Sequence, residues 1–316
     1  YEEEGLRPAP DADPVTLIRR LHFDLTGLPP TPKTVRAYAE DPSAKAYAAL
    51  VDQLLDSPHY GERMAAYWLD LVRFADTVGY HGDQPHNISP YRDWVIGAFN
   101  DNLPFDRFTR EQLAGDLLPG STTEQKVASG YNRLLQTTHE GGLQLKEYDA
   151  IYAADRVRNL SEVWMGATVG CAQCHDHKYD PYTITDHYAL AAFFSDLADR
   201  GFTGNSLPTK RPPEIIIHRP ENLAEMKSLQ ERMNVLLAPE AQKNFQDLQD
   251  RRNRLTASLR KAKEKDKADL QKRLDTIAGE RAKLAGEKDL AEFAKLRKLR
   301  AEIEKRGRPT MISQAV

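Results

Sequence analysis

One short segment of this sequence concentrates the residues that could do chemistry: GCAQCHDHKYDP, residues 170–181. It contains both cysteines of the 316-residue chain, Cys171 and Cys174, and His175 follows directly. The pattern C-x-x-C-H is the attachment signature of c-type haem. On a helical turn, positions i, i+3 and i+4 share one face, so two thiols and an imidazole can meet one porphyrin ring. We therefore predict one covalent haem c (iron) attached to Cys171 and Cys174, with His175 as the proximal iron ligand.

Two other interpretations of the same cysteines remain open. A redox-active disulfide is one, although the βαβ surroundings typical of that motif are not predicted here. A structural zinc site is the other. Its four ligands would lie within one short segment, whereas zinc sites usually draw two pairs from separated segments. Those ligands would be Cys171, Cys174, His175 and His177.

The residues after the motif suggest supporting roles. His177 lies two positions beyond His175, so it projects from another side of the turn. We expect it to hold the loop in place or to hydrogen-bond a haem propionate. Asp176 and Asp180 are candidate oxygen ligands for calcium.

The second face of the iron needs either a further ligand or an open site. A His or Met ligand there gives an electron-transfer centre, whereas an open site permits ligand binding or catalysis. Two polar, glycine-bearing connections, residues 76–89 and 137–146, supply the candidates. His139 is the first candidate distal ligand, and His86 and His81 come next. We interpret His22, His59, His187 and His218 as ordinary helix-end or surface histidines.

The elements that must position these residues are helices. Apolar residues recur at helical spacing over the first 200 residues, with Pro and Gly between the runs. The only β-like stretch is residues 215–218, between prolines. The pattern predicts a mainly α fold, a multi-helix haem-binding domain. Its helices are expected at about 13–26, 32–40, 43–56, 58–74, 90–100, 105–118, 123–136, 148–169 and 186–199.

The last third of the chain has a different composition. Residues 1–220 hold 21 Lys and Arg against 31 Asp and Glu, whereas residues 221–306 hold 22 against 16. Apolar residues there follow a heptad-like seam, interrupted at Pro239 and Gly286. Two long helices folded into a charged antiparallel hairpin are expected, and an intermolecular coiled coil is the alternative. The predicted domains are 1–205, a linker at 206–220, the coiled-coil hairpin at 221–306, and the start of a following segment at 307–316.

The composition also excludes several classes of protein. No run of 18 apolar residues exists, so no transmembrane segment is predicted. The basic residues of the last third alternate with acidic ones, as on a solvated helix, so nucleic-acid binding is not predicted. There is no phosphate-binding glycine loop, no G-x-S-x-G and no H-E-x-x-H. The polar, acidic first residues are not a signal peptide, and we expect the chain to be a fragment of a longer protein.

Several longer stretches form a set that is specific to one family. They are RRLHFDLTGLPPTP (19–32), SPHYGERMAAYWLDLVRFADTVGY (57–80), SPYRDWVIGAFNDNLPFDRFTREQLAGDLLP (89–119), DRVRNLSEVWMGATVGCAQCHDHKYDP (155–181) and HYALAAFF (187–194). Over about residues 6–200 the chain resembles the planctomycete-specific c-type cytochrome domain, second type. The resemblance implies a large, mostly helical, exported haem protein with flanking domains. The function of that family is poorly defined.

These observations lead to one expected function and two alternatives. We expect electron transfer by one haem c to or from an oxidoreductase partner or domain, in the periplasm or otherwise outside the cytoplasm. The acidic first part favours a basic redox partner. A haem enzyme with an open distal site, peroxidase-like or substrate-oxidising, is the first alternative. A binding scaffold with a structural zinc or haem site is the second.

Overall fold

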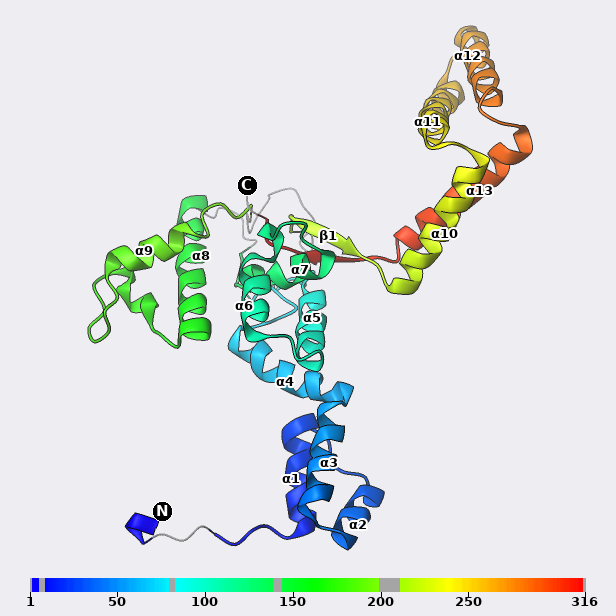
Figure 1. Cartoon of the computed structure of the whole chain (residues 1–316). Coiled ribbons are helices and arrows are strands. Elements are labelled where there is room, and N and C mark those ends of the chain that lie inside the picture. The colour runs from blue at the N-terminus through cyan, green and yellow to red at the C-terminus, as the bar shows by residue number, and fades with distance from the viewer. Residues whose placement is uncertain (1, 6–8, 80–82, 139–143, 199–210, 315–316) are drawn as a thin grey trace. The chain divides into compact units, whose positions relative to one another are not determined.

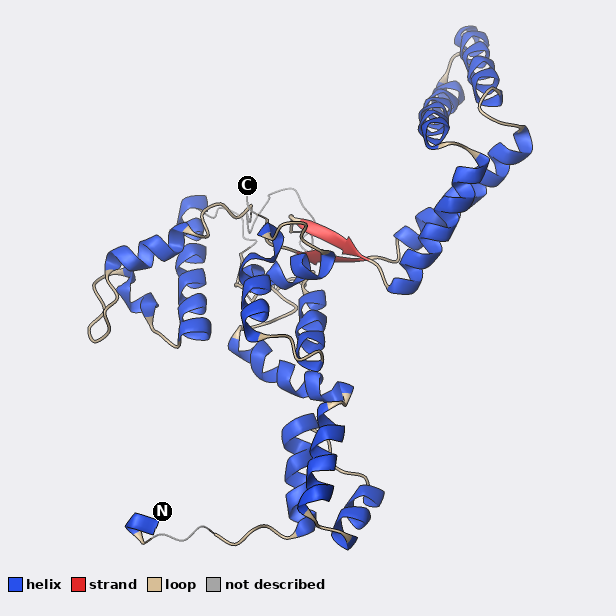
Figure 2. Cartoon of the chain, in the orientation of Figure 1, coloured by secondary structure: helices blue, strands red, loops and turns tan. Residues whose placement is uncertain are grey.

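The computed structural model of this chain is built almost entirely from helices, shown in blue in Figure 2. The structure describes residues 2–5, 9–79, 83–138, 144–198 and 211–314. The prediction of a mainly α-helical protein is confirmed. The chain divides into two compact units, one made of Tyr1–Ile215 with Pro309–Val316 and the other of Ile216–Arg308. No helix of the described residues is both long enough and apolar enough to cross a membrane.

The helices of the first unit follow the predicted order (Figure 1). The main difference is the run expected over about 148–169, where a π-helical turn at Ser161–Met165 follows the helix and Gly166, at φ 61°, ends it. The α-helices are α1 (Pro14–Thr26), α2 (Pro32–Glu40), α3 (Ala44–Leu55), α4 (Pro58–Leu71), α5 (Ser89–Asn100), α6 (Phe105–Ala114), α7 (Thr123–Ala128), α8 (Leu145–Leu160) and α9 (Ile184–Ala192). Short 3₁₀ turns lie at Glu2–Glu4, Gly115–Leu117, Ser129–Arg133 and Val169–Gln173.

Side-chain caps explain where the first four helices begin. The carboxylate of Asp13 accepts the backbone N–H groups of Val15 and Thr16 at 3.1 and 3.0 Å. Helices α2, α3 and α4 begin in the same way, each behind a Ser or Thr hydroxyl that accepts a first-turn N–H. These caps satisfy amide groups that a helix cannot pair by itself. Helices α1, α2 and α3 then bury Ile18, Tyr38 and Leu54 in a small core of their own.

A second core lies between α4, α5 and the 3₁₀ turn Ser129–Arg133. Its buried residues include Val72, Tyr91 and Val95. One polar side chain, Gln112 of α6, is fully buried beside them. Its Oε1 accepts hydrogen bonds from Trp68 Nε1 at 3.0 Å and from the Tyr91 hydroxyl at 2.5 Å. The amide of Gln112 therefore joins α4, α5 and α6 and satisfies two buried donors.

The last residues of the chain return to the first unit. Strand β1 (Glu214–Ile217) pairs with strand β2 (Arg308–Met311) in a two-stranded sheet. Met311 is 1% exposed in the second core, and its N–H donates to the Asn87 carbonyl at 2.7 Å. The sequence identified β1 and missed β2. Residues 307–316, expected to begin a following segment, thus supply a strand and core contacts as far as they are described.

A buried arginine holds this return in place. Arg133 is 4% exposed, and its guanidinium donates to the carbonyls of Arg211, Pro213 and Ile312 at 3.1, 3.3 and 2.9 Å. These carbonyls belong to the segment that leads into β1 and the segment that follows β2. The Arg133 side chain therefore links the segment before β1 and the segment after β2 to the 3₁₀ turn Ser129–Arg133.

The second unit consists of two antiparallel helix pairs. Helix α10 (Pro220–Leu236) packs against α13 (Glu287–Glu304), and α11 (Pro239–Lys261) packs against α12 (Glu264–Ala282). Phe245 and Phe293 meet edge to face in its core, with ring centroids 5.1 Å apart.

The expectation of two long helices in this region was wrong. The structure describes every residue of 211–314, and four helices lie there. Pro239 lacks the N–H that a continuous helix needs and instead occupies the first turn of α11, while Gly286 precedes α13. Both positions interrupt the heptad-like seam.

Arg133→Met should lower the free energy of unfolding by about 2–4 kcal/mol, because three buried carbonyls lose a charged donor. Urea denaturation of the full chain measures this. The control is Arg110→Met, whose partner Asp106 lies on an exposed helix face, and it should change stability by less than about 1 kcal/mol. Equal effects of the two substitutions would contradict the role assigned to Arg133.

Candidate functional site

The C-x-x-C-H motif lies on a short exposed turn between α8 and α9. Residues Val169–Gln173 form a 3₁₀ turn, and the Cys171 N–H donates to the Thr168 carbonyl at 3.0 Å. Cys171 and Cys174 are free thiols, and both are exposed, as is His175. Between them Ala172 is buried. The turn thus points its small apolar residue inward and leaves the three reactive side chains accessible.

The hydrogen bonding of His175 fixes its tautomer. Its Nδ1 lies 2.7 Å from the Asp176 carbonyl oxygen. A carbonyl oxygen can only accept, so Nδ1 carries the proton and donates it. When the ring is neutral, the other ring nitrogen, Nε2, keeps its lone pair. A neutral imidazole with Nδ1–H on a backbone carbonyl is the form in which histidine binds a metal through Nε2.

Helix α9 supports the turn from beneath. His187 is 1% exposed, and its Nδ1 donates to the Val169 carbonyl at 3.4 Å. The neighbouring Tyr188 donates its hydroxyl proton to the Gln173 carbonyl at 3.2 Å. His187 lies near the start of α9, as expected for a helix-end residue, but it is buried and not at the surface. Its neighbours along α9, Leu190 and Ala191, pack in the same small core, and this helical spacing was the available signal.

His177 locks the loop that follows the turn, in agreement with the structural role expected for it. Its side chain is 7% exposed. Its Nδ1 accepts the backbone N–H groups of Tyr179 and Asp180 at 3.2 and 2.8 Å, so Nε2 carries the proton and donates to the Thr168 hydroxyl at 2.9 Å. Both ring nitrogens are engaged. His177 could become a zinc ligand only by giving up these bonds.

Of the carboxylates near the turn, that of Asp176 is engaged in a local hydrogen bond. It accepts the Ile184 N–H at 2.9 Å. Within the described parts of the chain, no three His, Cys, Asp or Glu side chains form a group that could hold a metal ion. The zinc and calcium interpretations therefore find no assembled donor set among these residues.

Helix α8 packs against the other side of the turn. Val157 is fully buried against Val169 and Ala167. Gly170, directly before Cys171, lies against the side chain of Arg158, whose Cγ would be 3.3 Å from a β-carbon at that position. The absence of a side chain at Gly170 thus allows α8 and the turn to approach closely.

Large apolar or aromatic side chains close to the turn in the sequence are exposed. Five between residues 165 and 193 are exposed by 37–83%. They are Met165, Tyr179, Ile184, Tyr188 and Phe193.

Of the three candidate distal ligands, only His86 belongs to the described residues; His81 and His139 lie outside them. His86 is 8% exposed, and its Nε2 donates to the Ala75 carbonyl at 2.8 Å. It lines a pocket with Arg73, Thr77 and Leu135, and no described residue of the C-x-x-C-H turn lines that pocket. As a distal ligand His86 remains a prediction.

The two glycine-bearing connections that contain the candidate distal ligands, residues 76–89 and 137–146, contact each other. Gly79 and Thr137 form a parallel bridge, and the Thr137 N–H donates to the Val78 carbonyl at 3.2 Å. This pairing was not predicted, because it depends on contacts between residues far apart along the chain.

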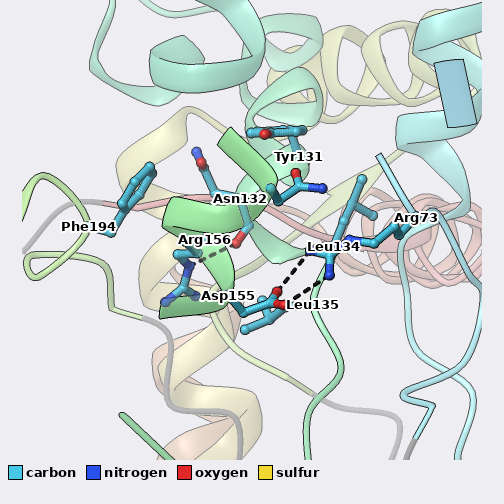
Figure 3. Close-up of a pocket in the computed structure, with 9 residues that line it drawn as sticks. Arg73, Tyr131, Asn132, Leu134, Leu135, Asp155, Arg156 and Phe194 are labelled. Carbon is cyan, nitrogen blue, oxygen red and sulfur yellow. Dashed lines mark hydrogen bonds and ion pairs between the residues drawn. The ribbon is translucent and has the colours of Figure 1, made fainter. Parts of the chain in front are cut away.

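A polar pocket opens on a different face of α8 (Figure 3). Arg73, at φ 62°, forms a two-pronged ion pair with Asp155, with both N–O distances 2.9 Å. The hydrogen bonds to Asp155 raise the pKa of Arg73. Two buried oxygens that line the pocket, the Tyr131 hydroxyl and Asn132 Oδ1, have no hydrogen-bond partner in the described structure. Burial raises the pKa of Tyr131, so this hydroxyl stays protonated. Asp155 and Val157 occupy different faces of α8, and Arg158, which lies against Gly170 of the turn, is 3.7 Å from Asp155.

Fold and site together define a mainly helical protein that presents a C-x-x-C-H turn at its surface. A family model, described as PSCyt2, protein of unknown function (DUF1549), matches residues 1–199. The chain therefore belongs to this family, and the resemblance to a cytochrome-named planctomycete family is confirmed at that level. No curated protein and no solved structure matches the chain.

His177→Ala should speed amide hydrogen exchange at Tyr179 and Asp180 by about tenfold or more, because both N–H groups lose their acceptor. Exchange mass spectrometry of the peptide that covers residues 176–183 measures this. His59→Ala, which removes an exposed histidine from α4, is the control and should leave that peptide unchanged. Unchanged exchange in His177→Ala would show that the ring does not hold the loop.

His86 should make the first unit less stable in acid. Burial is the main cause that lowers its pKa, and the charges of Arg211 and Arg133 act in the same direction. The unfolded chain then binds more protons than the folded chain as pH falls from 7 to 5, so stability falls with pH.

In His86→Gln, which keeps an N–H donor for Ala75, this pH dependence should become shallower, by at most about 1.4 kcal/mol per pH unit. Urea denaturation at several pH values measures the slope. His59→Gln is the exposed control. A slope in His86→Gln that equals that of the unaltered chain would contradict the assignment.

Proposed function

We propose that this chain is the haem-bearing part of an extracytoplasmic cytochrome that transfers electrons through one haem c. When bound, the haem iron supplies one-electron oxidation and reduction. The family assignment supports a cytochrome-related role without naming an activity. The observation that carries the proposal is the combination of two exposed thiols and one imidazole with a free Nε2 on a single turn.

Different residues attach the haem, bind the iron and support the turn. Cys171 and Cys174 hold the cofactor, since each thiol adds its sulfur and hydrogen across one vinyl group to form a thioether. His175 is presented in the tautomer that binds iron, because Asp176 accepts its Nδ1 proton. His187 and Tyr188 fix the backbone of the turn, and the exposed apolar side chains of residues 165–193 offer a surface that a porphyrin can cover.

The proposed location follows from the chemistry of attachment. Covalent haem attachment takes place on the outer face of the cytoplasmic membrane, so the proposed cytochrome is periplasmic or otherwise extracytoplasmic. Residues 1–220 carry an excess of acidic side chains, which favours a basic redox partner and an association rate that falls with salt.

Covalent attachment is tested by expressing the chain together with the haem-attachment machinery and recording a pyridine haemochrome spectrum of the denatured protein. The unaltered chain should keep a c-type signal, and Cys171→Ser with Cys174→Ser should lose it. Gln173→Ala, within the same turn but without a ligand side chain, is the matched control and should keep it. Absence of haem from the unaltered chain would overturn the proposal and lead to zinc analysis.

The native spectrum then separates electron transfer from catalysis. A six-coordinate, low-spin iron supports electron transfer, and an open, high-spin iron that binds cyanide or carbon monoxide rapidly supports the haem-enzyme alternative. If the iron is low-spin, replacing His139, His86 and His81 in turn by Gln should identify the distal ligand, since only one variant should become high-spin.

A further inference from the structure

The strongest charge asymmetry of the chain lies in the second unit. Residues 251–273 contain ten Lys and Arg and three Asp and Glu. They form the second half of α11, a two-residue connection at 262–263, and the first half of α12. We call this segment the basic hairpin. Because α11 and α12 pack side by side, the cations of both helices belong to one structural element.

Most of these cations have no acidic partner. Within residues 251–273, all of which the structure describes, ion pairs occur only at Arg251 and at Lys267. Their partners include Glu280 and Glu264. The other eight cations are exposed. They are Arg252, Arg254, Arg260, Lys261, Lys263, Lys265, Lys272 and Arg273.

The composition of the basic hairpin favours a protein partner over a membrane or a single-stranded nucleic acid. Among residues 237–298 no large apolar side chain is exposed, so the hairpin has no anchor to insert into a bilayer. Between Phe245 and Phe293 there is no aromatic residue on which bases could stack. The basic hairpin therefore recognises a partner by its positive charge. An acidic protein surface carries the complementary negative charge.

The first unit of this protein contains an acidic segment. The segment 144–198, which carries the C-x-x-C-H turn, holds eight Asp and Glu against four Lys and Arg. Asp176 and Asp180, next to His175, are exposed, as are Glu147 and Asp149 of α8. Within the second unit, the basic hairpin lies at the end of α10 and α13 that is farther from residues 216 and 308.

We propose that the basic hairpin of one copy docks on the acidic segment 144–198 of a second copy. The contact joins two different surfaces, so it can be repeated from copy to copy. It depends on charge and therefore weakens with salt, as the Debye length falls from about 30 Å at about 10 mM to about 3 Å at about 1 M. The proposal does not require haem, so it can fail while the cytochrome proposal holds.

Sedimentation velocity of the full chain at several protein concentrations and salt concentrations gives the first test. We expect concentration-dependent association at about 10 mM salt that disappears at about 1 M. Carbodiimide cross-linking of a mixture of labelled and unlabelled copies gives the second test. Cross-links between Lys261, Lys263 or Lys265 of one isotope form and carboxylates of 144–198 of the other are expected.

A variant and its control separate specific docking from general charge. The quadruple variant Arg252→Gln, Arg254→Gln, Arg260→Gln and Lys261→Gln should weaken association by about tenfold or more. The control removes four exposed lysines outside the basic hairpin: Lys283→Gln, Lys288→Gln, Lys298→Gln and Lys305→Gln. Circular dichroism checks that both variants keep their helices, and the control should associate nearly as the unaltered chain does.

Three outcomes would overturn the proposal. The chain could remain monomeric at about 10 mM salt. Cross-links could form only within one copy. The variant and its control could weaken association equally, which would assign the effect to net charge. Salt-sensitive binding to anionic vesicles or to a DNA duplex, without self-association, would replace the second copy by that other partner and would also overturn the proposal.

Discussion

The backbone of the C-x-x-C-H turn is held by side chains that come from outside the turn. Its three reactive groups all face outward, so none of them can anchor it. The anchors are His187 and Tyr188 of α9, which bond to the carbonyls of Val169 and Gln173. On the other side α8 packs closely because residue 170 is glycine. The motif residues are thus accessible, and other residues hold the backbone of the turn in place. Binding a rigid cofactor needs both properties.

The sequence predicted those features that depend on short-range patterns. The helices expected at about 13–26, 32–40, 43–56 and 58–74 follow from apolar spacing and from the Pro and Gly residues between the runs, and the motif at residues 171–175 follows from its own spacing. The sequence did not predict features that depend on contacts between distant residues. Strand β2 exists because residues 308–311 pair with residues 214–217 across the inserted second unit. His187 looked like a surface residue, since its burial depends on a turn that precedes it by 14 positions or more.

Arg133 shows how an inserted unit can coexist with an intact core. The chain leaves the first unit after residue 215 and returns at residue 309. A buried guanidinium that binds carbonyls on both crossings makes the return segment part of the core, along with Met311. An uncompensated buried charge would be costly, but each carbonyl here supplies a charge-assisted acceptor.

The two histidines of the motif region are held in opposite tautomers, and this separates their roles. At His175 a carbonyl accepts the Nδ1 proton, which leaves Nε2 with its lone pair at an exposed position. At His177 two amide groups donate to Nδ1, which places the proton on Nε2 and directs it to Thr168. Only His175 can bind a metal without breaking existing hydrogen bonds. A structural zinc site needs four protein donors, and the turn offers three without breaking existing hydrogen bonds. Covalent haem needs only two thiols and one imidazole, and those are the groups that the turn presents.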